Sequence, residues 1–390
     1  PVDVTPDGAR LLACNTPDAR LEILDLPGGL PVPAASVPVG LDPVAVRART
    51  ATEAWVVNHL SDSVSVVDLA TARVVATLDT MDEPCDVVFA GGKAYVSCSQ
   101  ANAVQVFDPS DLAAPPVTIP IAAEDPRAMA VSADGREVYF AIFESGNGST
   151  VLGGGADTSL GIVGFPPNVV NDPTGPHAGV NPPPNAGGSF DPPQRAGNPA
   201  PPRVALIVRK DDAGLWRDDT GADWTRLVSG PDAPRSGRVP GWDVVDRDVA
   251  VIDVATGAVR WIERLMNCNM ALAVPPVDGR GTVVGTDALN EVRFEPNLRG
   301  RFGRVLLAAA PAGGCPGAVS DLNPHLDYSG PTIPQGQRDL SLGDPRGIAW
   351  HPSGARGFVT GMGSNNLLVI DAGGAPVARL ALREGPTGVV

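Results

Sequence analysis

The chain has 390 residues, of which 43% are hydrophobic, and its formal net charge is −15 at pH 7. The hydrophobic content excludes a wholly disordered chain, while 45 Gly and 41 Pro supply the many turns of an all-β protein. The acidic charge argues against binding to nucleic acid, whose phosphates require a basic surface. The sequence contains no run of about 20 apolar residues that could span a bilayer.

The first feature along the chain is a repeat of about 40 residues, which is the length of one β-propeller blade. Each unit opens with a short apolar strand, turns into a second strand, and has a third strand that ends in Asp. The openings fall at Pro1, Pro43, Pro84, Pro126, Asn269, Pro345 and Pro386. Sheets repeated in this way cover one another's apolar faces when they are arranged radially. The sequence therefore predicts an all-β fold, a seven-bladed β-propeller with six blade units and the opening strand of a seventh.

The third unit carries two cysteines on its first two strands. If Gly91-Gly92 forms a two-residue hairpin loop, Cys85 lies directly opposite Cys98 at a non-hydrogen-bonded position, about 4.5 Å away between Cα atoms. This spacing is within the disulfide range. The pattern predicts a disulfide between Cys85 and Cys98, with two buried thiols as the alternative, and a disulfide favours a location outside the cytoplasm.

The fourth unit is interrupted between its second and third strands. The interruption divides the chain into propeller residues 1–143, a Pro- and Gly-rich insertion at residues 144–247, and propeller residues 248–390. Its proline-rich part predicts extended chain, and its tryptophans predict a segment that packs against the propeller. A smaller insertion is split between residues 287–302 and 329–342. Loops that join the second strand of a blade to its third strand, and loops that join one blade to the next, leave a propeller on one common face. We therefore expect this face to be elaborated for binding.

The large insertion also contains an acidic run that includes Asp218, Asp219 and Asp223. Calcium prefers several oxygen ligands from a loop that bears Gly and Asp, which makes Ca²⁺ a candidate at these three residues. Their spacing does not match the calcium loop of an EF-hand. A solvated acidic loop is the alternative.

Two strands in the second unit carry a family resemblance. The segments Trp55-Val-Val-Asn58 and Ser63-Val-Ser-Val-Val-Asp68 resemble the bacterial YVTN (Tyr-Val-Thr-Asn) β-propeller repeat family, which includes YncE-like periplasmic proteins. The resemblance covers essentially the whole chain outside the insertions. It implies a propeller fold and a periplasmic or extracellular bacterial location, whereas the family hosts several unrelated roles.

Three further segments carry a narrower resemblance: residues 286–295, 323–329 and 385–390. They are similar to parts of large secreted bacterial proteins in which a YVTN propeller precedes a cytochrome c-like region with Cys-x-x-Cys-His haem sites. This chain has no Cys-x-x-Cys-His motif. The resemblance thus implies haem c only in a region beyond Val390, and no cofactor within these residues other than the candidate Ca²⁺.

The residue after each opening proline is expected near the mouth of the central tunnel. Arg127, Arg346 and Thr387 occupy such positions, and Met270 occupies the equivalent position after Asn269. Two arginines could receive a carboxylate or a phosphate. The alternative is that they bond to loop carbonyls or to Asp125 and Asp344 and close the hub.

Motifs of catalysis are absent from the sequence. It contains no Gly-x-Ser-x-Gly elbow, no phosphate-binding loop with Lys and no His-Glu-x-x-His helix, and its four histidines lie in different loops. We therefore expect no catalytic residues and interpret the chain as an extracytoplasmic binding or scaffold propeller, the platform of a larger electron-transfer protein associated with a c-type cytochrome. Its partner would be another protein or its own C-terminal region. A propeller lactonase and the propeller subunit of a quinone-type dehydrogenase are the alternatives.

Overall fold

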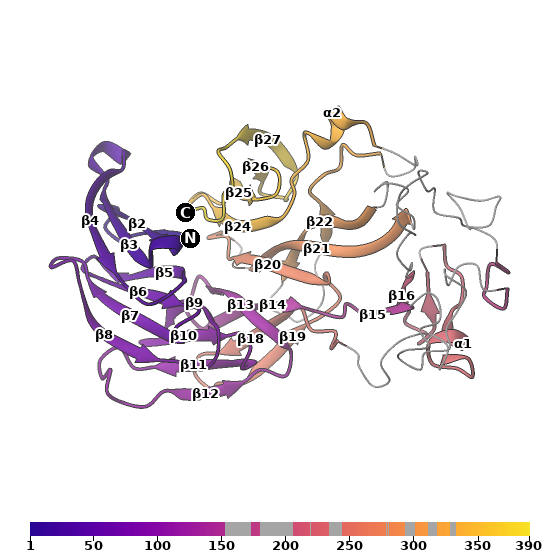
Figure 1. Ribbon diagram of the computed structural model, residues 1–390, viewed down its shortest axis with the longest axis horizontal. Coiled ribbons are helices and arrows are strands. Elements are labelled where there is room, and N and C mark those ends of the chain that lie inside the picture. Colours follow the sequence, from indigo (N-terminus) through magenta and orange to yellow (C-terminus); the bar gives the residue numbers. More distant parts are fainter. Residues whose placement is uncertain are drawn as a thin grey trace, which may run out of the picture.

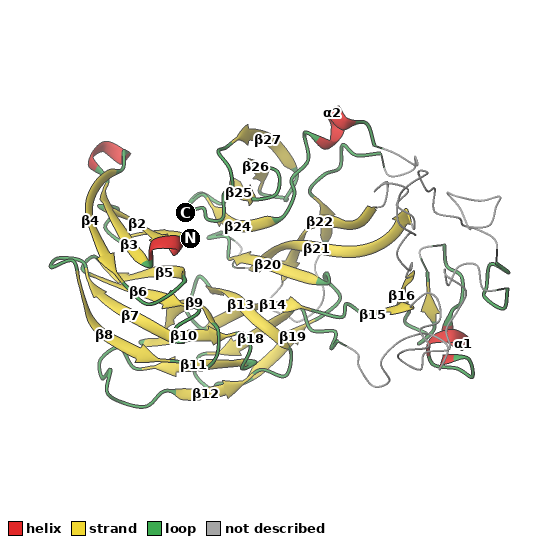
Figure 2. Ribbon diagram, in the orientation of Figure 1, coloured by secondary structure: helices red, strands yellow, loops and turns green. Residues whose placement is uncertain are grey.

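A computed structural model describes residues 1–152, 173–179, 206–218, 220–233, 244–277, 279, 281–292, 301–310, 318–327 and 333–390. The described part of the chain is nearly all β, and Figure 2 shows a few short helices among the strands and loops. Six four-stranded antiparallel units form the body of the molecule. They follow one another around a centre that lies near both labelled chain ends (Figure 1).

Each unit is a blade whose first strand lies innermost. The first blade comprises β1 (Val2–Val4), β2 (Arg10–Asn15), β3 (Arg20–Asp25) and β4 (Val32–Pro38), with short 3-10 turns at Thr16–Asp18 and Pro27–Gly29. The second comprises β5 (Pro43–Thr50), β6 (Glu53–Asn58), β7 (Ser63–Asp68) and β8 (Arg73–Asp79). The third comprises β9 (Pro84–Ala90), β10 (Lys93–Cys98), β11 (Ala103–Phe107) and β12 (Val117–Pro120).

The fourth blade comprises β13 (Glu124–Val131), β14 (Glu137–Glu144), β18 (Val249–Asp253) and β19 (Val259–Ile262). The fifth comprises β20 (Cys268–Ala273), β21 (Gly281–Val292), β22 (Arg301–Ala310) and β23 (Val319–Asp321). The sixth comprises β24 (Pro345–Trp350), β25 (Arg356–Gly361), β26 (Asn366–Asp371) and β27 (Pro376–Ala381). A single bridge between Glu144 and Cys268 joins the fourth and fifth blades into one eight-stranded sheet.

Burial of both faces of each sheet explains why the middle strands are so apolar. In β7 the first five residues are all buried, whereas the outer strand β8 alternates between exposed and partly buried residues. Trp55 on β6 packs against Phe89 of the next blade with its ring centroid 5.5 Å away and the two planes at 87°. Edge-to-face contact of this kind stabilises the stacking of blades beyond the area that it buries.

Apolar clusters join each blade to the next, from the first blade to the sixth. Within the described part of the chain, no such cluster joins the sixth blade back to the first. The C-terminal residues 386–390 lie between these two blades instead. A Cβ on Gly388 would stand 3.1 Å from the Cα of Pro1, and one on Gly347 of β24 would stand 3.4 Å from the carbonyl oxygen of Thr387.

The large insertion begins where β14 ends at Glu144 and closes where β18 begins at Val249, so it lies between the second and third strands of its blade, as the sequence predicted. Its described residues form β15 (Ser149–Leu152), β16 (Leu206–Lys210), β17 (Trp216–Arg217) and α1 (Thr225–Val228). They enclose a small apolar cluster of their own around Trp224, which is fully buried. The described part of the insertion is therefore packed around a core of its own, and it lies beside the propeller at the right of Figure 1.

The second predicted insertion takes a different form. Residues 287–302 were expected as a loop, but β21 continues to Val292 and β22 already begins at Arg301, so both ends of this segment lengthen a hairpin of the fifth blade. In residues 329–342 the structure describes a short helix, α2 (Gln335–Arg338). No helix among the described residues is both long enough and apolar enough to cross a bilayer.

Candidate binding site at the tunnel mouth

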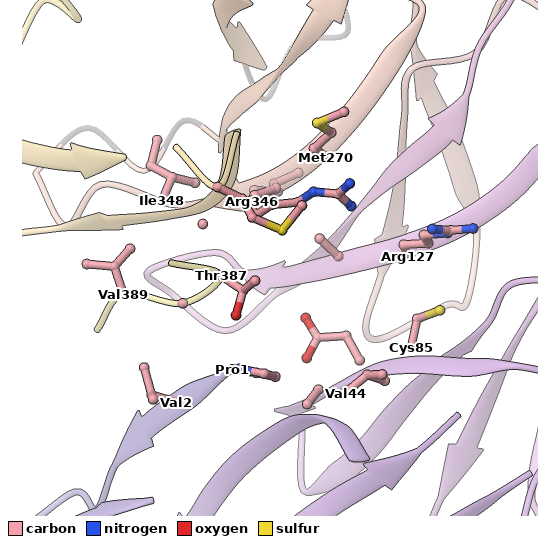
Figure 3. Close-up of a pocket in the computed structure, with 18 of the residues that line it drawn as sticks. Pro1, Val2, Val44, Cys85, Arg127, Met270, Arg346, Ile348, Thr387 and Val389 are labelled. Carbon is pink, nitrogen blue, oxygen red and sulfur yellow. The ribbon is translucent and has the colours of Figure 1, made fainter. Parts of the chain in front are cut away.

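The centre of the propeller holds a cavity of about 570 Å³. Inner-strand residues from all six blades line it, together with Thr387, Gly388 and Val389 of the C-terminal segment. Figure 3 shows these residues converging from separate ribbons. The three predicted tunnel residues, Arg127, Arg346 and Met270, all line this one cavity.

Arg127 is held in place by its own tripeptide. Its Nη2 donates to Oδ2 of Asp125 at 2.7 Å, and its guanidinium carbon lies 4.0 Å from the ring centroid of Phe143. Asp125 adopts a left-handed backbone with φ of 65°, and its N–H bonds to Asn102. The Nε of Arg127 and Oδ1 of Asp125 are buried without a hydrogen-bond partner among the described residues. The arginine is thus positioned while part of its donor capacity remains unused.

Arg346 repeats this arrangement two blades away. Its Nε donates to Oδ1 of Asp344 at 2.7 Å, and Asp344 again adopts a left-handed backbone, with φ of 50°. Both sites are Asp-Pro-Arg sequences on the inner strand: Pro345 begins β24, and Pro126 is the third residue of β13. The alternative of pairing with Asp125 and Asp344 is therefore present in the structure, yet both guanidinium groups still border the cavity. In Figure 3 they extend toward the same side.

A network of charged side chains connects neighbouring inner strands along the tunnel wall. Nη2 of Arg47 on β5 donates to Oδ2 of Asp86 on β9 at 3.1 Å, and the same oxygen accepts the N–H of Met129 on β13 at 2.9 Å. Asp3 on β1 accepts the N–H of Ala48 at 2.7 Å. Burial raises the pKa of Asp3 even though Arg47 acts in the opposite direction. These carboxylates tie inner strands of successive blades together, and aspartate in the third opening position is the signal that could have revealed them.

The predicted disulfide between Cys85 and Cys98 is wrong, because both thiols are free. The two strands stay in register up to Ser97 opposite Asp86, but a bulge then sets Cys98 opposite Pro84. Cys85 instead lines the tunnel, and burial raises its pKa to about 11. Cys98 is fully buried between the second and third blades, and burial raises its pKa to about 12. Cys315 lies outside the described residues.

His59 is a tunnel residue that the sequence did not single out. Its Nδ1 lies 3.1 Å from the carbonyl oxygen of Pro84 and 3.7 Å from Sγ of Cys85, and its Nε2 lies 3.7 Å from Oε2 of Glu83. A donor bond from Nδ1 to the Pro84 carbonyl leaves no acceptor there for the thiol proton. Because burial also keeps the Cys85 thiol protonated, this group lacks an activated nucleophile.

The acidic run has a structural role. Asp218 accepts bonds from the N–H and hydroxyl of Thr220 and from Nε1 of Trp224 at 3.0 Å, and it lies 2.7 Å from Nε2 of His177. Burial would raise its pKa, but these hydrogen bonds outweigh burial and hold the pKa at about 2. Asp223 accepts the N–H of Thr225 at the start of α1.

The described residues include no group of three or more His, Cys, Asp or Glu side chains that could hold a metal ion. Asp219, the third residue of the calcium hypothesis, lies outside them. The structure thus gives this hypothesis no support at Asp218 or Asp223. Of the histidines, His351 is exposed in a turn, where its Nδ1 lies 2.8 Å from the hydroxyl oxygen of Ser353.

Comparison with known proteins identifies the fold. No family model and no curated protein matches the sequence. Among solved structures, hydrazine synthase of Kuenenia stuttgartiensis aligns with a TM-score of 0.62 at 17% identity, over 99% of this chain and 87% of that one. The periplasmic gluconolactonase PpgL of Pseudomonas aeruginosa gives 0.50 at 14% identity, over 99% and 86%. The Swd1 β-propeller domain of Myceliophteria thermophila gives 0.50 at 10% identity, over 99% and 86%. At these identities the likeness establishes a β-propeller and nothing about activity.

Proposed function

We propose that this chain is a binding platform that works outside the cytoplasm and receives an acidic group of its partner at the tunnel mouth. The observation that carries the proposal is the pair of Asp-Pro-Arg sites, in which Arg127 and Arg346 are each fixed by a 2.7 Å bond and border the same cavity. A guanidinium that keeps free N–H donors is suited to a carboxylate or phosphate. Met270, on the blade between them, supplies an apolar contact at the same mouth.

Several features support binding without chemistry. The tunnel thiol Cys85 has a raised pKa, the Nδ1 of His59 faces a backbone carbonyl, and Asp86 is occupied by Arg47 and a backbone N–H. Catalysis usually requires a nucleophile beside a free base or a group with a suitably shifted pKa. None of the three side chains meets this requirement in the arrangement described.

Calorimetric titration of the chain with citrate tests the site. We expect binding to the wild type, and a loss of at least about tenfold in affinity when Arg127→Gln and Arg346→Gln are combined, because each substitution removes a charge-assisted hydrogen bond. Arg356→Gln is the matched control, since the Arg356 side chain is exposed and, among the described residues, donates only to the carbonyl of Ala355. Equal affinity of the double variant and the control would refute the proposed site.

A lactonase is the second candidate, because PpgL is described as a gluconolactonase and because His59, Asp86 and both arginines border one cavity. The lactonase hypothesis predicts that the wild-type protein hydrolyses glucono-δ-lactone faster than its His59→Gln and Asp86→Asn variants do. The platform proposal predicts no difference between the three proteins. A pH-stat assay, which follows the acid released, decides between them.

The electron-transfer context rests on the family resemblance and on the hydrazine synthase likeness. It predicts that the protein isolated from its source carries, or copurifies with, a c-type haem with a Soret band. Intact mass and a visible spectrum test this directly. A mass near 40 kDa without visible absorption would leave a binding propeller that acts without haem, and a copurified small subunit would favour the quinone-dehydrogenase alternative.

We further propose that residues 386–390 serve as the innermost strand of a seventh blade. Their position between β24 and β1 supports this, as does the lack of any backbone hydrogen bond from them to other described residues. Pairing with additional strands would protect their amides from hydrogen exchange. Rapid exchange at Gly388 and Val390 in the protein isolated from its source would contradict a seventh blade.

A further inference from the structure

A second cavity, of about 490 Å³, lies between the large insertion and the fifth blade. It shares no lining residue with the tunnel cavity. Its walls come from the loop after β14, the end of β16, the return segment before β18, and strands β21 to β23. Figure 1 shows β15 and β16 beside the far end of the β21–β22 hairpin, where these walls meet.

One wall of this cavity is fixed by an ion pair whose carboxylate is buried. Nη2 of Arg209 lies 2.7 and 2.8 Å from the two carboxylate oxygens of Asp287 and also donates to the carbonyl of Ala288. Asp287 is only 5% exposed and accepts a further bond from Asn147 at 2.9 Å. Because these charges satisfy one another, they make a rigid wall and leave little capacity for a ligand.

Other charged groups around the cavity are occupied too. Asp211 accepts two backbone N–H groups and Nε of Arg217, and the guanidinium of Arg264 is paired with Asp212. These pairs lie at the rim and are partly exposed. Each reduces the charge that the cavity offers to a ligand.

Two opposite charges on the lining remain available. Lys210 is exposed and forms no ion pair among the described residues; its ammonium lies 6.0 Å from the ring centroid of Trp216. Asp246 is partly buried, and among the described residues its Oδ1 accepts only the N–H of Arg264, at 3.3 Å. The two are not paired with each other, so within the described part of the chain the cavity offers one ammonium and one carboxylate that have no ion-pair partner.

Gly148 lies beside the carboxylate of Asp246 on the cavity lining. Its φ of 59° is left-handed, and a Cβ there would stand 3.6 Å from Oδ2 of Asp246. The rest of the lining includes Leu306, which is 8% exposed, and Val319, which is 41% exposed. The cavity thus combines a carboxylate, an ammonium and an apolar wall, and its volume is typical of small-molecule sites.

We propose that this cavity binds a zwitterionic small molecule of the α-amino-acid type with an apolar side chain. Asp246 receives the ligand ammonium, Lys210 receives the ligand carboxylate, and Leu306 and Val319 contact the side chain. A zwitterion matches the overall charge balance of the lining, which a simple anion or a simple cation would not.

Calorimetry with the full chain and L-leucine tests the proposal. Two analogues each lack one charge: 4-methylpentanoic acid has no ammonium, and 3-methylbutylamine has no carboxylate. We expect leucine to bind at least about tenfold more tightly than either analogue, because each lost charge removes a charge-assisted hydrogen bond. Equal affinities for leucine and one analogue would overturn the proposal. The absence of detectable leucine binding at a concentration on the order of 10 mM would also overturn it, because a dissociation constant above that value is too weak for a specific site.

Variants identify the two residues. Lys210→Met and Asp246→Asn are each expected to weaken leucine binding by about tenfold or more. Lys93→Met, which changes a lysine on the third blade, is the matched control and should leave binding unchanged. Because Lys210 is exposed, its variant keeps the fold. Unaltered leucine affinity in Lys210→Met would refute the role of this lysine. Leucine binding that is retained when Arg127→Gln and Arg346→Gln are combined would show that leucine binds at this cavity and not at the tunnel.

Discussion

Asp86 and Arg47 belong to different blades, and their side chains meet at 3.1 Å across the tunnel wall. The aspartate is 6% exposed, and its second bond, to the N–H of Met129, extends the link to a third blade. A single carboxylate therefore connects the inner strands of the second, third and fourth blades.

Asp86→Ala should destabilise the protein by about 2 kcal/mol, because it leaves the guanidinium of Arg47 and a backbone N–H without their acceptor. Urea unfolding followed by circular dichroism measures the change. Asp25→Ala is the matched control, since Arg10 and Asp25 form an exposed pair at 3.3 Å that is worth about 0.5 kcal/mol. Equal losses in the two variants would contradict the linking role of Asp86.

Asp248 should make stability depend on pH between 5 and 7. Burial raises its pKa to about 6, although N–H groups of Met266 and Leu265 partly oppose burial. A carboxyl whose folded pKa is raised is favoured in its protonated form, so its contribution is present at low pH and is lost as pH rises through 6. Relative to Asp248→Asn, the wild type should gain about 1 kcal/mol between pH 7 and pH 5.

The comparison with Asp248→Asn is essential, because other carboxyl groups titrate identically in both proteins. Asp218 has its pKa held at about 2 and so contributes nothing to the change in this window. Thermal unfolding at several pH values gives the difference. A constant difference between the two proteins from pH 7 to pH 5 would show that Asp248 does not titrate there.

The thiol of Cys85 should react slowly with iodoacetamide at pH 8. A pKa of about 11 leaves roughly one thiolate in a thousand, whereas a thiol with the ordinary pKa of about 8.5 is about one-quarter ionised, so we expect at least about a 100-fold slower reaction. Peptide mapping by mass spectrometry follows the site, and the urea-unfolded chain is the control. A peptide pair joined through Cys85 and Cys98 before reduction would disprove the free thiols.

Gly285→Ala should destabilise the protein by about 3 kcal/mol. A Cβ at this position would stand 1.9 Å from the carbonyl oxygen of Cys268 on the neighbouring strand, so the inner hairpin of the fifth blade has to open. Gly336→Ala is the matched control: nothing lies within 4 Å of its Cβ position, and alanine favours the helix α2. Denaturant unfolding of both variants should show a loss in the first and no loss in the second.

The repeat made Arg127, Arg346 and Met270 predictable, because a fixed period assigns equivalent positions in every blade even where individual strands are short. The partner of Cys85 was not predictable. A one-residue bulge at Cys85, which recurs after the opening residue of the second, fifth and sixth blades, shifts the register there, and counting back from the hairpin loop does not include it.

His59 escaped notice for a related reason. It follows β6 in a loop, and only the closing of the second blade against the third brings its ring to Cys85. The role of Asp218 was also hidden, because its partner His177 is distant in sequence and joins it only through the folding of the insertion. Contacts that depend on the path of a long connection leave no local signal in the sequence.

The separation of β14 from β18 has a consequence for the timing of synthesis. The first three blades are contiguous in sequence and can form as they leave the ribosome, but β14 ends at Glu144 and its partner begins only at Val249. At roughly 5–20 residues per second, the β13–β14 hairpin waits on the order of 5–20 seconds with the edge that carries Tyr139 and Phe140 unpaired. During this interval the nascent chain exposes an apolar strand edge, and this is the stage at which a holdase chaperone would bind it most tightly.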